Sequence, residues 1–324
     1  MIVHRDLARV PGAAAGRAVT IGAFDGVHLG HQAVLRLVRD LARARGCAAT
    51  VLTFDRHPAE VVRPDSAPKL LTTLDQKLEL LDATGCVDEC VVLTFDEARS
   101  REPAEEFVAE VLAGALAARL VVVGADFHFG HRRHGDVPLL QRMGAELGFE
   151  VLGLGLVASP DGGVASDGAL PYSSTRVRAL LAEGDVEAAA AILGRPHEVR
   201  GPVGPGGERA RVLGGATARV AVPARTCLPA DGAYAGTFTD AGGAERPAAL
   251  WVGPAVPGEA APPLEVHVLG AAAAPGGGPA TVRFTRRVRA ATPAASAGEH
   301  VAAARDDVAA ARAALARAAG DRGR

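Results

Sequence analysis

The sequence predicts a doubly wound α/β domain with a parallel sheet, followed by a small all-β barrel domain and a C-terminal helix. Three observations support this prediction. Strand-like and helix-like segments alternate from residue 18 to residue 194. Arg119–Gly124 contains three consecutive valines, which is typical of a strand buried on both faces. After residue 208, short apolar stretches are separated by turns rich in glycine and proline, which favours a small barrel.

In the first domain, short apolar runs predict strands and apolar residues at helical spacing predict helices. The predicted strands are Ala18–Phe24, Ala48–Phe54, Glu89–Phe95, Arg119–Gly124 and Phe149–Val157. The predicted helices are His31–Arg45, Leu74–Ala83, Pro103–Ala117, Val137–Leu147, Ser173–Leu181 and Val186–Leu193. Alternation of this kind indicates a Rossmann-like sheet covered by helices on both faces. In such a sheet, ligands bind at the carboxyl ends of the strands.

The boundary between the domains is predicted from a change in composition. Between Arg195 and Gly207, three prolines and four glycines interrupt every periodic pattern. We therefore predict a first domain over 1–195, a linker over 196–207 and a second domain over 208–324. In the second domain, the predicted strands are Ala218–Val222, Ala248–Val252, Leu264–Leu269 and Thr281–Phe284. A loop over Gly270–Pro279 and a helix over Glu299–Ala319 complete it.

The composition excludes several classes of function. The 35 basic and 37 acidic residues give a net charge of −2, so nucleic acids and membrane surfaces are not expected partners. No apolar run approaches the roughly 18–20 residues that a membrane helix needs. The four cysteines do not have the spacing of a zinc site, and the first residues do not form a secretory signal. We expect a cytoplasmic protein that acts on small molecules; its oligomeric state is not predicted.

The stretch with the sequence IGAFDGVHLGH, residues 21–31, follows a predicted strand and opens a predicted helix. Its glycines allow the backbone to turn tightly and to approach a ligand closely. The amides and the positive dipole end of the helix favour an anion. His28 and His31 stand three residues apart at that end, where imidazoles can donate hydrogen bonds to phosphate oxygens.

We interpret this stretch as a nucleotide-phosphate site. The histidines are the predicted catalytic residues, and the other predicted phosphate-binding residues of the stretch are Gly22, Phe24, Asp25, Gly26 and Gly30. The glycine pattern is neither a Walker loop nor the dinucleotide-binding fingerprint. The alternatives are that the two histidines are ordinary surface caps of the helix, or half of a metal site.

The same stretch resembles the signature of the bacterial bifunctional riboflavin kinase/FAD synthetases, which belong to the HxGH nucleotidyltransferase superfamily. TFDRHP at 53–58 resembles the family's TFxPHP, and GADFHFG at 124–130 resembles its GxDFxFG. SSTRVR at 173–178 resembles SSTxIR, and LGRP at 193–196 resembles the segment that ends the first domain. The resemblance covers about residues 15–197.

The resemblance implies adenylyl transfer: the phosphate of FMN attacks the α-phosphorus of ATP, which gives FAD and pyrophosphate. His28 and His31 would hold the phosphates of ATP, and Mg²⁺ would bridge those phosphates. Phe54 and Asp126 would contact the flavin. The residues that would bind the departing pyrophosphate are Ser173, Ser174, Thr175 and Arg178, the last of which would also be catalytic.

Some of these residues also have plainer interpretations. Phe54 and Phe127 can pack against the sheet, and Asp126 can simply end a strand. His57 can serve a turn, and the hydroxyls at 173–175 can cap a helix. The sequence also departs from the family, which often has asparagine at the position of Ala23 and usually has proline at the position of Arg56.

The second domain departs further from the riboflavin kinases that it resembles. LGGATAR at 213–219 stands where the family has GxPTAN, whose threonine and asparagine help to hold magnesium and ATP. Thr217 matches and would be the remaining metal ligand, but Arg219 replaces the asparagine and would repel a cation. Glu265 matches the family's base, whereas Gly270 stands where an aspartate is usual. We therefore predict that riboflavin phosphorylation is weak or absent.

Three alternatives remain open from the sequence. The chain can be a fully bifunctional kinase and synthetase that tolerates Arg219. It can be a nucleotidyltransferase for another phosphorylated acceptor, since the HxGH core does not select the acceptor. It can also be a flavin- or nucleotide-binding protein without catalytic activity, although the intact pair of His28 and His31 argues against this.

Overall fold

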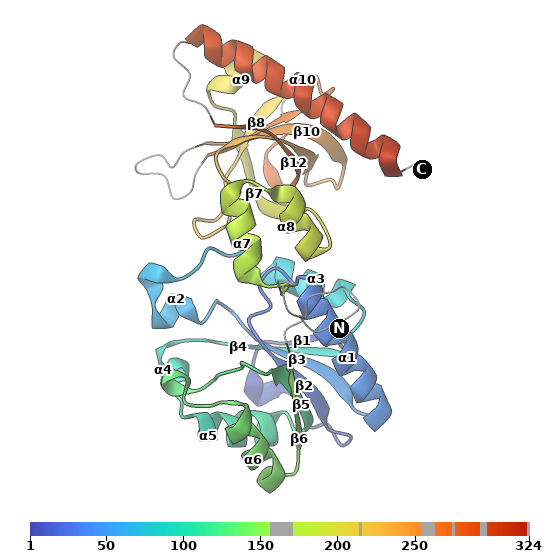
Figure 1. Ribbon diagram of the computed structural model, residues 1–324, viewed down its shortest axis with the longest axis vertical. Helices are drawn as coiled ribbons and strands as arrows, with labels where there is room; N and C mark the ends of the chain where they lie inside the picture. Colours follow the sequence, from blue (N-terminus) through green and yellow to red (C-terminus); the bar gives the residue numbers. More distant parts are fainter. Residues whose placement is uncertain (156–170, 214–215, 254–262, 274–275, 292–296, 323–324) are drawn as a thin grey trace. The chain divides into compact units, whose positions relative to one another are not determined.

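The computed structural model of the chain describes residues 1–155, 171–213, 216–253, 263–273, 276–291 and 297–322. The protein forms two compact units, Met1–Ser173 and Ser174–Arg324 (Figure 1). The first unit is an α/β domain and the second contains a barrel, as the sequence predicts.

The first unit contains a six-stranded parallel sheet with the strand order β1-β4-β3-β2-β5-β6. Its strands are β1 (Ile2–His4), β2 (Arg17–Ile21), β3 (Ala48–Phe54), β4 (Glu89–Leu93), β5 (Ala118–Gly124) and β6 (Glu150–Leu154). The five predicted strands are present, but β2 ends before Phe24 and β4 before Phe95, so both rings lie in loops. The edge strand β1 was not predicted, because three residues carry no periodic signal.

The helices of the first unit follow the predictions at α1, α3 and α6. The α-helices are α1 (Leu29–Arg45), α2 (Ala59–Val62), α3 (Leu74–Ala83), α4 (Glu97–Ser100), α5 (Ala104–Glu106) and α6 (Val137–Leu147). The predicted helix over Pro103–Ala117 is divided: α5 continues as a π-helix, η3 (Phe107–Ala115). The amide of Leu116 donates to the carbonyl of Val111, five residues back, which is the π-helical pattern.

Helices cover both faces of the sheet (Figure 1). Along β5, Val121 and Val123 pack into a cluster with side chains of η3 and α6, such as Leu112. Leu120 and Val122 point to the opposite face, where their cluster includes residues of α1. This alternation is the two-residue period of a strand that is buried on both sides. The prediction from the three valines, a strand buried on both faces, is therefore confirmed.

The second unit contains a closed antiparallel barrel with the strand order β10-β11-β8-β7-β12-β9. Its strands are β7 (His197–Pro205), β8 (Thr217–Val220), β9 (Gly232–Thr239), β10 (Glu245–Val252), β11 (Leu264–Val268) and β12 (Gly278–Ala290). Its helices are α7 (Ser174–Glu183), α8 (Val186–Leu193), α9 (Glu208–Leu213) and α10 (Ala297–Arg322). Strands β7 and β9 and helix α9 were not predicted. Part of the predicted loop over Gly270–Pro279 lies outside the described residues.

The segment 196–207, which the sequence predicts to be a linker, is instead mostly strand β7 of the barrel. It pairs with β12 in its first part and with β8 near its end. A Cβ atom at Gly201 would lie 2.0 Å from the carbonyl oxygen of Ala221, so glycine is required there by the close approach of two backbones. Gly201 therefore serves the close packing of a barrel strand rather than a flexible connection.

The compact units meet between Ser173 and Ser174, which lies before the boundary that the sequence predicts at residue 195. Helices α7 and α8 group with the barrel because they bond to its strand β12. Arg287 donates to the carbonyl of Glu183, and Arg286 forms an ion pair with Glu187 at 2.9 Å.

Helix α10 is fixed to the barrel by the buried carboxylate of Asp307. This carboxylate accepts a hydrogen bond from the indole nitrogen of Trp251 at 2.9 Å and two from the guanidinium of Arg289, each at 2.9 Å. Small buried residues of the helix, Ala311 and Ala314, belong to the same apolar cluster as Trp251. The helix therefore packs closely along one narrow face.

Candidate functional site

The two histidines of the first βα junction lie against each other at the start of α1. His28 is the N-cap residue, and its Nδ1 accepts a hydrogen bond from the backbone amide of His31 at 3.3 Å. The two imidazoles are stacked, with ring centroids 3.6 Å apart and planes inclined by 19°. His28 therefore does cap the helix.

The loop before the histidines has a strained backbone. Gly26 has a φ angle of +82°, and the buried residues Phe24 and Val27 have φ angles of +48° and +40°. A β-branched residue in this region is a rare and costly conformation, of the order of 1–3 kcal/mol. Of the three glycines singled out in the sequence, Gly26 alone has a left-handed backbone.

Gly30 is not needed for a turn; it leaves space for a neighbouring ring. A Cβ atom at this position would lie 3.1 Å from Nδ1 of His28 and 3.2 Å from its Cε1. The lack of a side chain at Gly30 therefore leaves room for the His28 ring over the first turn of α1. Gly22 similarly faces the Phe24 ring, at 3.2 Å.

His31 carries a buried polar atom without a hydrogen bond. Its Nδ1 has no partner among the described residues, although an unsatisfied buried polar atom costs about 1–3 kcal/mol. Burial lowers the pKa of His31 well below its ordinary value, and the positive charges of His28 and Lys77 lower it further. The imidazole is therefore neutral, and the chemistry of its free nitrogen fits a phosphate or a hydroxyl.

Asp25, a predicted phosphate-binding residue, is engaged within the protein. Its carboxylate accepts hydrogen bonds from the amides of Leu71 and Thr72 at 3.0 Å and from the hydroxyl of Thr72 at 3.1 Å. That hydroxyl also accepts a bond from the amide of Gly26. Asp25 thus fixes the loop to the segment that precedes α3, and a contact of Asp25 with phosphate stays a prediction.

Lys77 of α3 is a buried residue near the site that sequence analysis missed. Its ammonium donates to the carbonyls of Ala23 at 3.1 Å and Phe54 at 3.0 Å, and to the hydroxyl of Thr53 at 3.3 Å. In the sequence, it is one polar residue on an amphipathic helix, and such residues usually face solvent. The signal that could have found it is its rarity, because the chain contains only one other lysine, Lys69.

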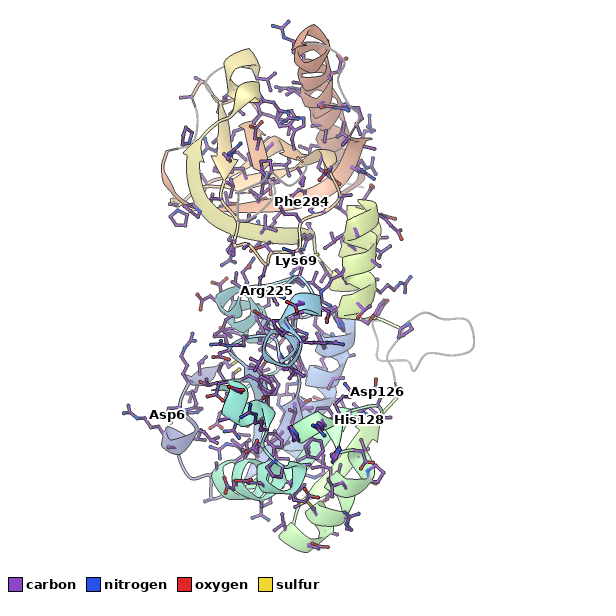
Figure 2. All side chains as sticks on the ribbon, turned by 90° about the vertical axis from the view of Figure 1, so that its left-hand side faces the viewer. Asp6, Lys69, Asp126, His128, Arg225 and Phe284 are labelled. Atoms are coloured by element: carbon purple, nitrogen blue, oxygen red, sulfur yellow. The ribbon has the colours of Figure 1, made fainter. Side chains whose placement is uncertain are left out.

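The predicted flavin-binding residues follow β3 and β5. Phe54 ends β3, is half-buried and contacts the ring of Phe95 edge-on at 5.3 Å. Asp126 is exposed after β5, and its carbonyl oxygen lies 2.8 Å from Nδ1 of His128 (Figure 2). Both positions lie at the carboxyl edge of the sheet, where ligands bind in this architecture. Their contact with flavin stays a prediction.

Two residues of these motifs have the plainer roles that the sequence allowed. Phe127 packs against the core of the first unit and stacks on Phe129 at 5.4 Å. His57 accepts a hydrogen bond at Nδ1 from the amide of Ala59 at 3.2 Å, so it serves the turn before α2.

The boundary between the two compact units falls within the SSTRVR motif. Ser173 ends the first unit, and α7 begins with Ser174 in the second. Thr175 is exposed and Arg178 is half-buried. Binding of pyrophosphate by this motif stays a prediction.

In the barrel, the residues that resemble a kinase site have partners outside the resembled motifs. The hydroxyl of Thr217 lies 2.9 Å from Nδ1 of His267. Glu265 is buried, and its carboxylate forms an ion pair at 3.1 Å with Arg209 of α9. Arg219 stands opposite Glu265 in the pairing of β8 with β11.

The side chains around Glu265 offer few ligands to a protein-bound Mg²⁺. Arg219, opposite Glu265, is cationic and would repel a metal ion, and the hydroxyl of Thr217 shares a hydrogen bond with His267. Within the described residues, no group of three or more histidine, cysteine, aspartate or glutamate side chains is placed to hold a metal ion.

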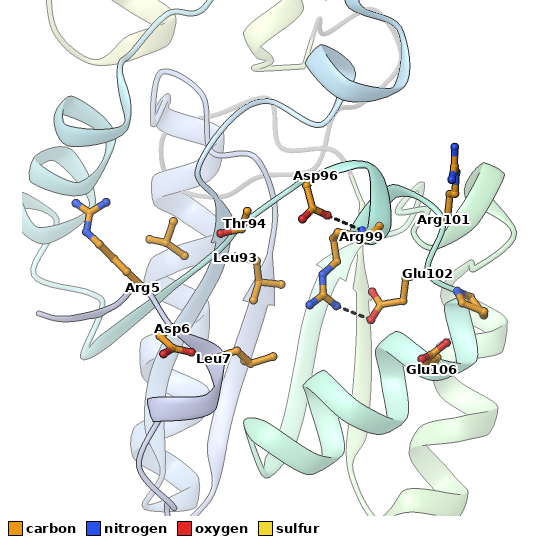
Figure 3. Close-up of a pocket in the computed structure, with 13 residues that line it drawn as sticks. Arg5, Asp6, Leu7, Leu93, Thr94, Asp96, Arg99, Arg101, Glu102 and Glu106 are labelled. Carbon is orange, nitrogen blue, oxygen red and sulfur yellow. Dashed lines mark hydrogen bonds and ion pairs between the residues drawn. The ribbon is translucent and has the colours of Figure 1, made fainter.

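A pocket of about 800 Å³ lies at the carboxyl end of β4 (Figure 3), and neither His28 nor His31 lines it. Its wall carries three arginines and four carboxylates, and within the wall Arg99 bonds to Glu102 and Asp96 accepts a hydrogen bond from the amide of Arg99. Burial raises the pKa of Glu102. An excess of carboxylates does not favour the phosphates of a nucleotide, so the pocket is not our candidate site.

Comparison with known proteins shows similarity in both halves of the chain. A family described as FAD synthetase matches residues 11–167, and a family described as riboflavin kinase matches residues 193–315. The bifunctional riboflavin kinase/FMN adenylyltransferase of Escherichia coli (strain K12) is 35% identical over 256 residues, which cover 78% of each chain. The protein of the same name from Pseudomonas fluorescens is 38% identical over 256 residues, which also cover 78% of each chain.

The fold also matches a solved structure over almost its whole length. The crystal structure of a macrolide-efflux protein from Streptococcus pneumoniae has a TM-score of 0.77 and 26% identity, and the match covers 94% of this chain and 96% of that one. In the parts of this chain that the structure describes, no helix is long and apolar enough to cross a bilayer.

Proposed function

The chain belongs to the family of bifunctional riboflavin kinase/FMN adenylyltransferases, and on this premise we propose how its first unit transfers AMP from ATP to FMN. A phosphate oxygen of FMN attacks the α-phosphorus of ATP. The bond from the α-phosphorus to the bridging oxygen breaks, and pyrophosphate leaves with the electron pair. Mg²⁺ enters with ATP as part of the substrate.

The observation that supports this proposal most strongly is the stacked histidine pair with a buried, unpartnered nitrogen on His31. Nucleotidyl transfer requires positioning and neutralisation of charge rather than a covalent nucleophile. The imidazoles of His28 and His31 would donate hydrogen bonds to phosphate oxygens as negative charge moves toward the leaving group. The first amides of α1 have no acceptor within the helix and would add to this stabilisation.

The other predicted site residues complete the proposal. Ser173, Ser174, Thr175 and Arg178 bind pyrophosphate, and Phe54 and Asp126 contact the flavin. The backbone of Gly22, Phe24, Gly26 and Gly30 shapes the phosphate loop, which Asp25 holds in place through Leu71 and Thr72. We expect a cytoplasmic enzyme.

The test is a product assay by mass spectrometry with FMN and ATP. We expect FAD and pyrophosphate in equal amounts. Binding of ATP without release of pyrophosphate would instead indicate a non-catalytic binding protein. Transfer to another phosphorylated acceptor, or from CTP, at a higher rate than to FMN from ATP would change the substrate assignment.

For the barrel, we propose that riboflavin phosphorylation is weak or absent. The support is chemical: Arg219 stands where a cation ligand is expected, Thr217 is bonded to His267, and the carboxylate of Glu265 is already paired with Arg209. With riboflavin and ATP, we expect little FMN. In the variant Arg219→Asn, we expect more FMN than in the unmodified protein, since a repelling charge is replaced by a neutral oxygen ligand.

The second candidate function is full bifunctionality. It is favoured by the match of the riboflavin kinase family over 193–315 and by the closed barrel that carries Glu265. Rapid formation of FMN from riboflavin by the unmodified protein would establish it and reject the weakened kinase.

A further inference from the structure

Lys77 has an environment unlike that of an ordinary helix surface residue. It lies in the second turn of α3, and only 7% of its surface is exposed. A buried ammonium is costly unless its hydrogens are bonded. Here three acceptors, the carbonyls of Ala23 and Phe54 and the hydroxyl of Thr53, match the three hydrogens of the ammonium.

These acceptors come from the two chain segments that leave the carboxyl edge of the sheet beside the site. Ala23 follows β2 and directly precedes the strained residue Phe24, whereas Phe54 ends β3. The hydroxyl of Thr53 also donates to the carbonyl of Ala23, at 3.4 Å. One ammonium therefore joins the phosphate loop to the end of the neighbouring strand.

The residue type supports a specific role. Of the 35 basic residues in the chain, all except Lys69 and Lys77 are arginines. The planar guanidinium of arginine cannot direct three donors at acceptors arranged around a single nitrogen, whereas an ammonium can. A lysine at this position therefore matches the geometry of its partners, in a chain that otherwise uses arginine.

We propose that Lys77 is a positioning residue for adenylyl transfer: its ammonium holds the phosphate loop against the end of β3. The inference rests on the proposed function of the first unit. The positive charges near His31 are those of His28 and Lys77. The groups that face Lys77 are Asp25, Asp55, Glu60 and Cys90.

The charge of Lys77 has a consequence for His31. Together with burial and His28, it lowers the pKa of His31, so that the ring stays neutral while the site is empty. Burial lowers the pKa of Lys77 itself, and its acidic neighbours partly restore it. A neutral ring keeps one donor and one acceptor, which is the form that the proposed phosphate contacts use.

The experiment compares the full-length protein with Lys77→Met, which keeps the apolar stem and removes the charge. In the unliganded protein, NMR titration of His31 should show a pKa higher than in the unmodified protein. With FMN and ATP, kcat should fall by about 10²-fold, since a misplacement of about an ångström at a reacting centre has such an effect. The acid limb of the pH profile should move to higher pH.

Two further variants separate the charge from the structure. Lys69→Met removes the exposed lysine (Figure 2) and should leave both the rate and the His31 titration unchanged. Thr53→Val removes one acceptor but keeps the charge, so it should slow the reaction without raising the pKa of His31. If Lys77→Met does not fold, Thr53→Val still decides whether the loop is held through this network.

The outcomes also separate this inference from the proposed function. If the unmodified protein makes no FAD, the proposed function fails, while the titration of His31 still tests the role of the charge. If FAD is formed and Lys77→Met keeps both the rate and the pKa of His31, the positioning role of Lys77 is rejected. An unchanged rate in Thr53→Val would reject the role of the hydrogen-bond network.

Discussion

His28 and His31 show how single residues make a site from an ordinary helix start. His28 caps α1 through Nδ1, and this bond fixes the ring against its neighbour. His31 is left with a buried nitrogen that no described residue satisfies. The cap role of His28 therefore does not exclude the predicted role of the pair as a ligand for phosphate, although the sequence presents the two as alternatives.

The first prediction concerns His31. His31→Ala should reduce the rate of FAD formation by about 10²-fold, because a group that stabilises charge in the transition state is removed. Steady-state kinetics with FMN and ATP measures the effect. His134→Ala, at an exposed position, is the control and should react at the normal rate. An unchanged rate in His31→Ala would exclude the proposed role.

The second prediction concerns Gly30. Gly30→Ala places a methyl group 3.1 Å from the His28 ring, so the ring must give way by a few tenths of an ångström and its stacking on His31 is disturbed. We expect a large loss of kcat with little loss of stability, as measured by turnover and by urea unfolding. Gly12→Ala is the matched control, because no atom lies within 4 Å of its Cβ position. Equal activity of the two variants would contradict this role of Gly30.

Sequence analysis found the histidines but not the lysine. The histidines belong to a contiguous motif, and its order of strand, glycines and helix predicts that they lie at the start of the helix. Lys77 acts on atoms 23 to 54 residues away, and two of its three partners are backbone carbonyls that carry no residue-specific signal. For the same reason, the anchoring of Asp25 to Leu71 and Thr72 could not be read from the chain.

At the scale of elements, the bounds of helices and strands were predicted more reliably than the pairing of strands. The bounds of β3, α3, α6 and α8 agree with the periodicity of the sequence. Strand β7 was missed, since glycine and proline indicate a linker unless the partner strands are known. Gly201 of this strand is required by the close approach of the backbone at Ala221, and the sequence alone does not show which segments lie next to each other.

The third prediction concerns the attachment of α10. Asp307→Ala removes the acceptor of both Trp251 and Arg289 and should lower the free energy of unfolding by about 1–3 kcal/mol. Trp251 is the single tryptophan of the chain, so its fluorescence reports the transition in urea. Asp306→Ala changes an exposed neighbour and should have almost no effect. Similar stability of the two variants would contradict the proposed attachment.

For the whole molecule, the succession of an α/β unit and a barrel was predicted, but the point where they meet was not. Helices α7 and α8 have apolar faces that fit either unit equally well from the sequence. Their bonds to β12 assign them to the barrel, and these bonds involve Arg286 and Arg287, which have no distinctive sequence pattern.

The fourth prediction concerns stability against acid. Burial lowers the pKa of His31 in one unit and of His267 in the other. Below about pH 6.5, the ordinary value for histidine, the unfolded chain binds protons that the folded protein does not. The free energy of unfolding should therefore fall as the pH decreases from 7.5 to 5.5.

Urea unfolding at both pH values measures this dependence. His31→Gln and His267→Gln should each reduce the loss of stability in acid. His134→Gln should not, because this side chain is exposed. A loss of stability that is the same in all three variants would show that other groups cause it.

The two sheets differ in how they end. The barrel closes on itself, whereas the parallel sheet has two edges, β1 and β6. Both edges carry exposed apolar side chains, Ile2 on β1 and Leu152 on β6. An open edge with such side chains can recruit a strand from another molecule. Aggregation in concentrated or heated samples should thus start from the α/β unit, and a lysine or proline on these edges is the rational way to suppress it.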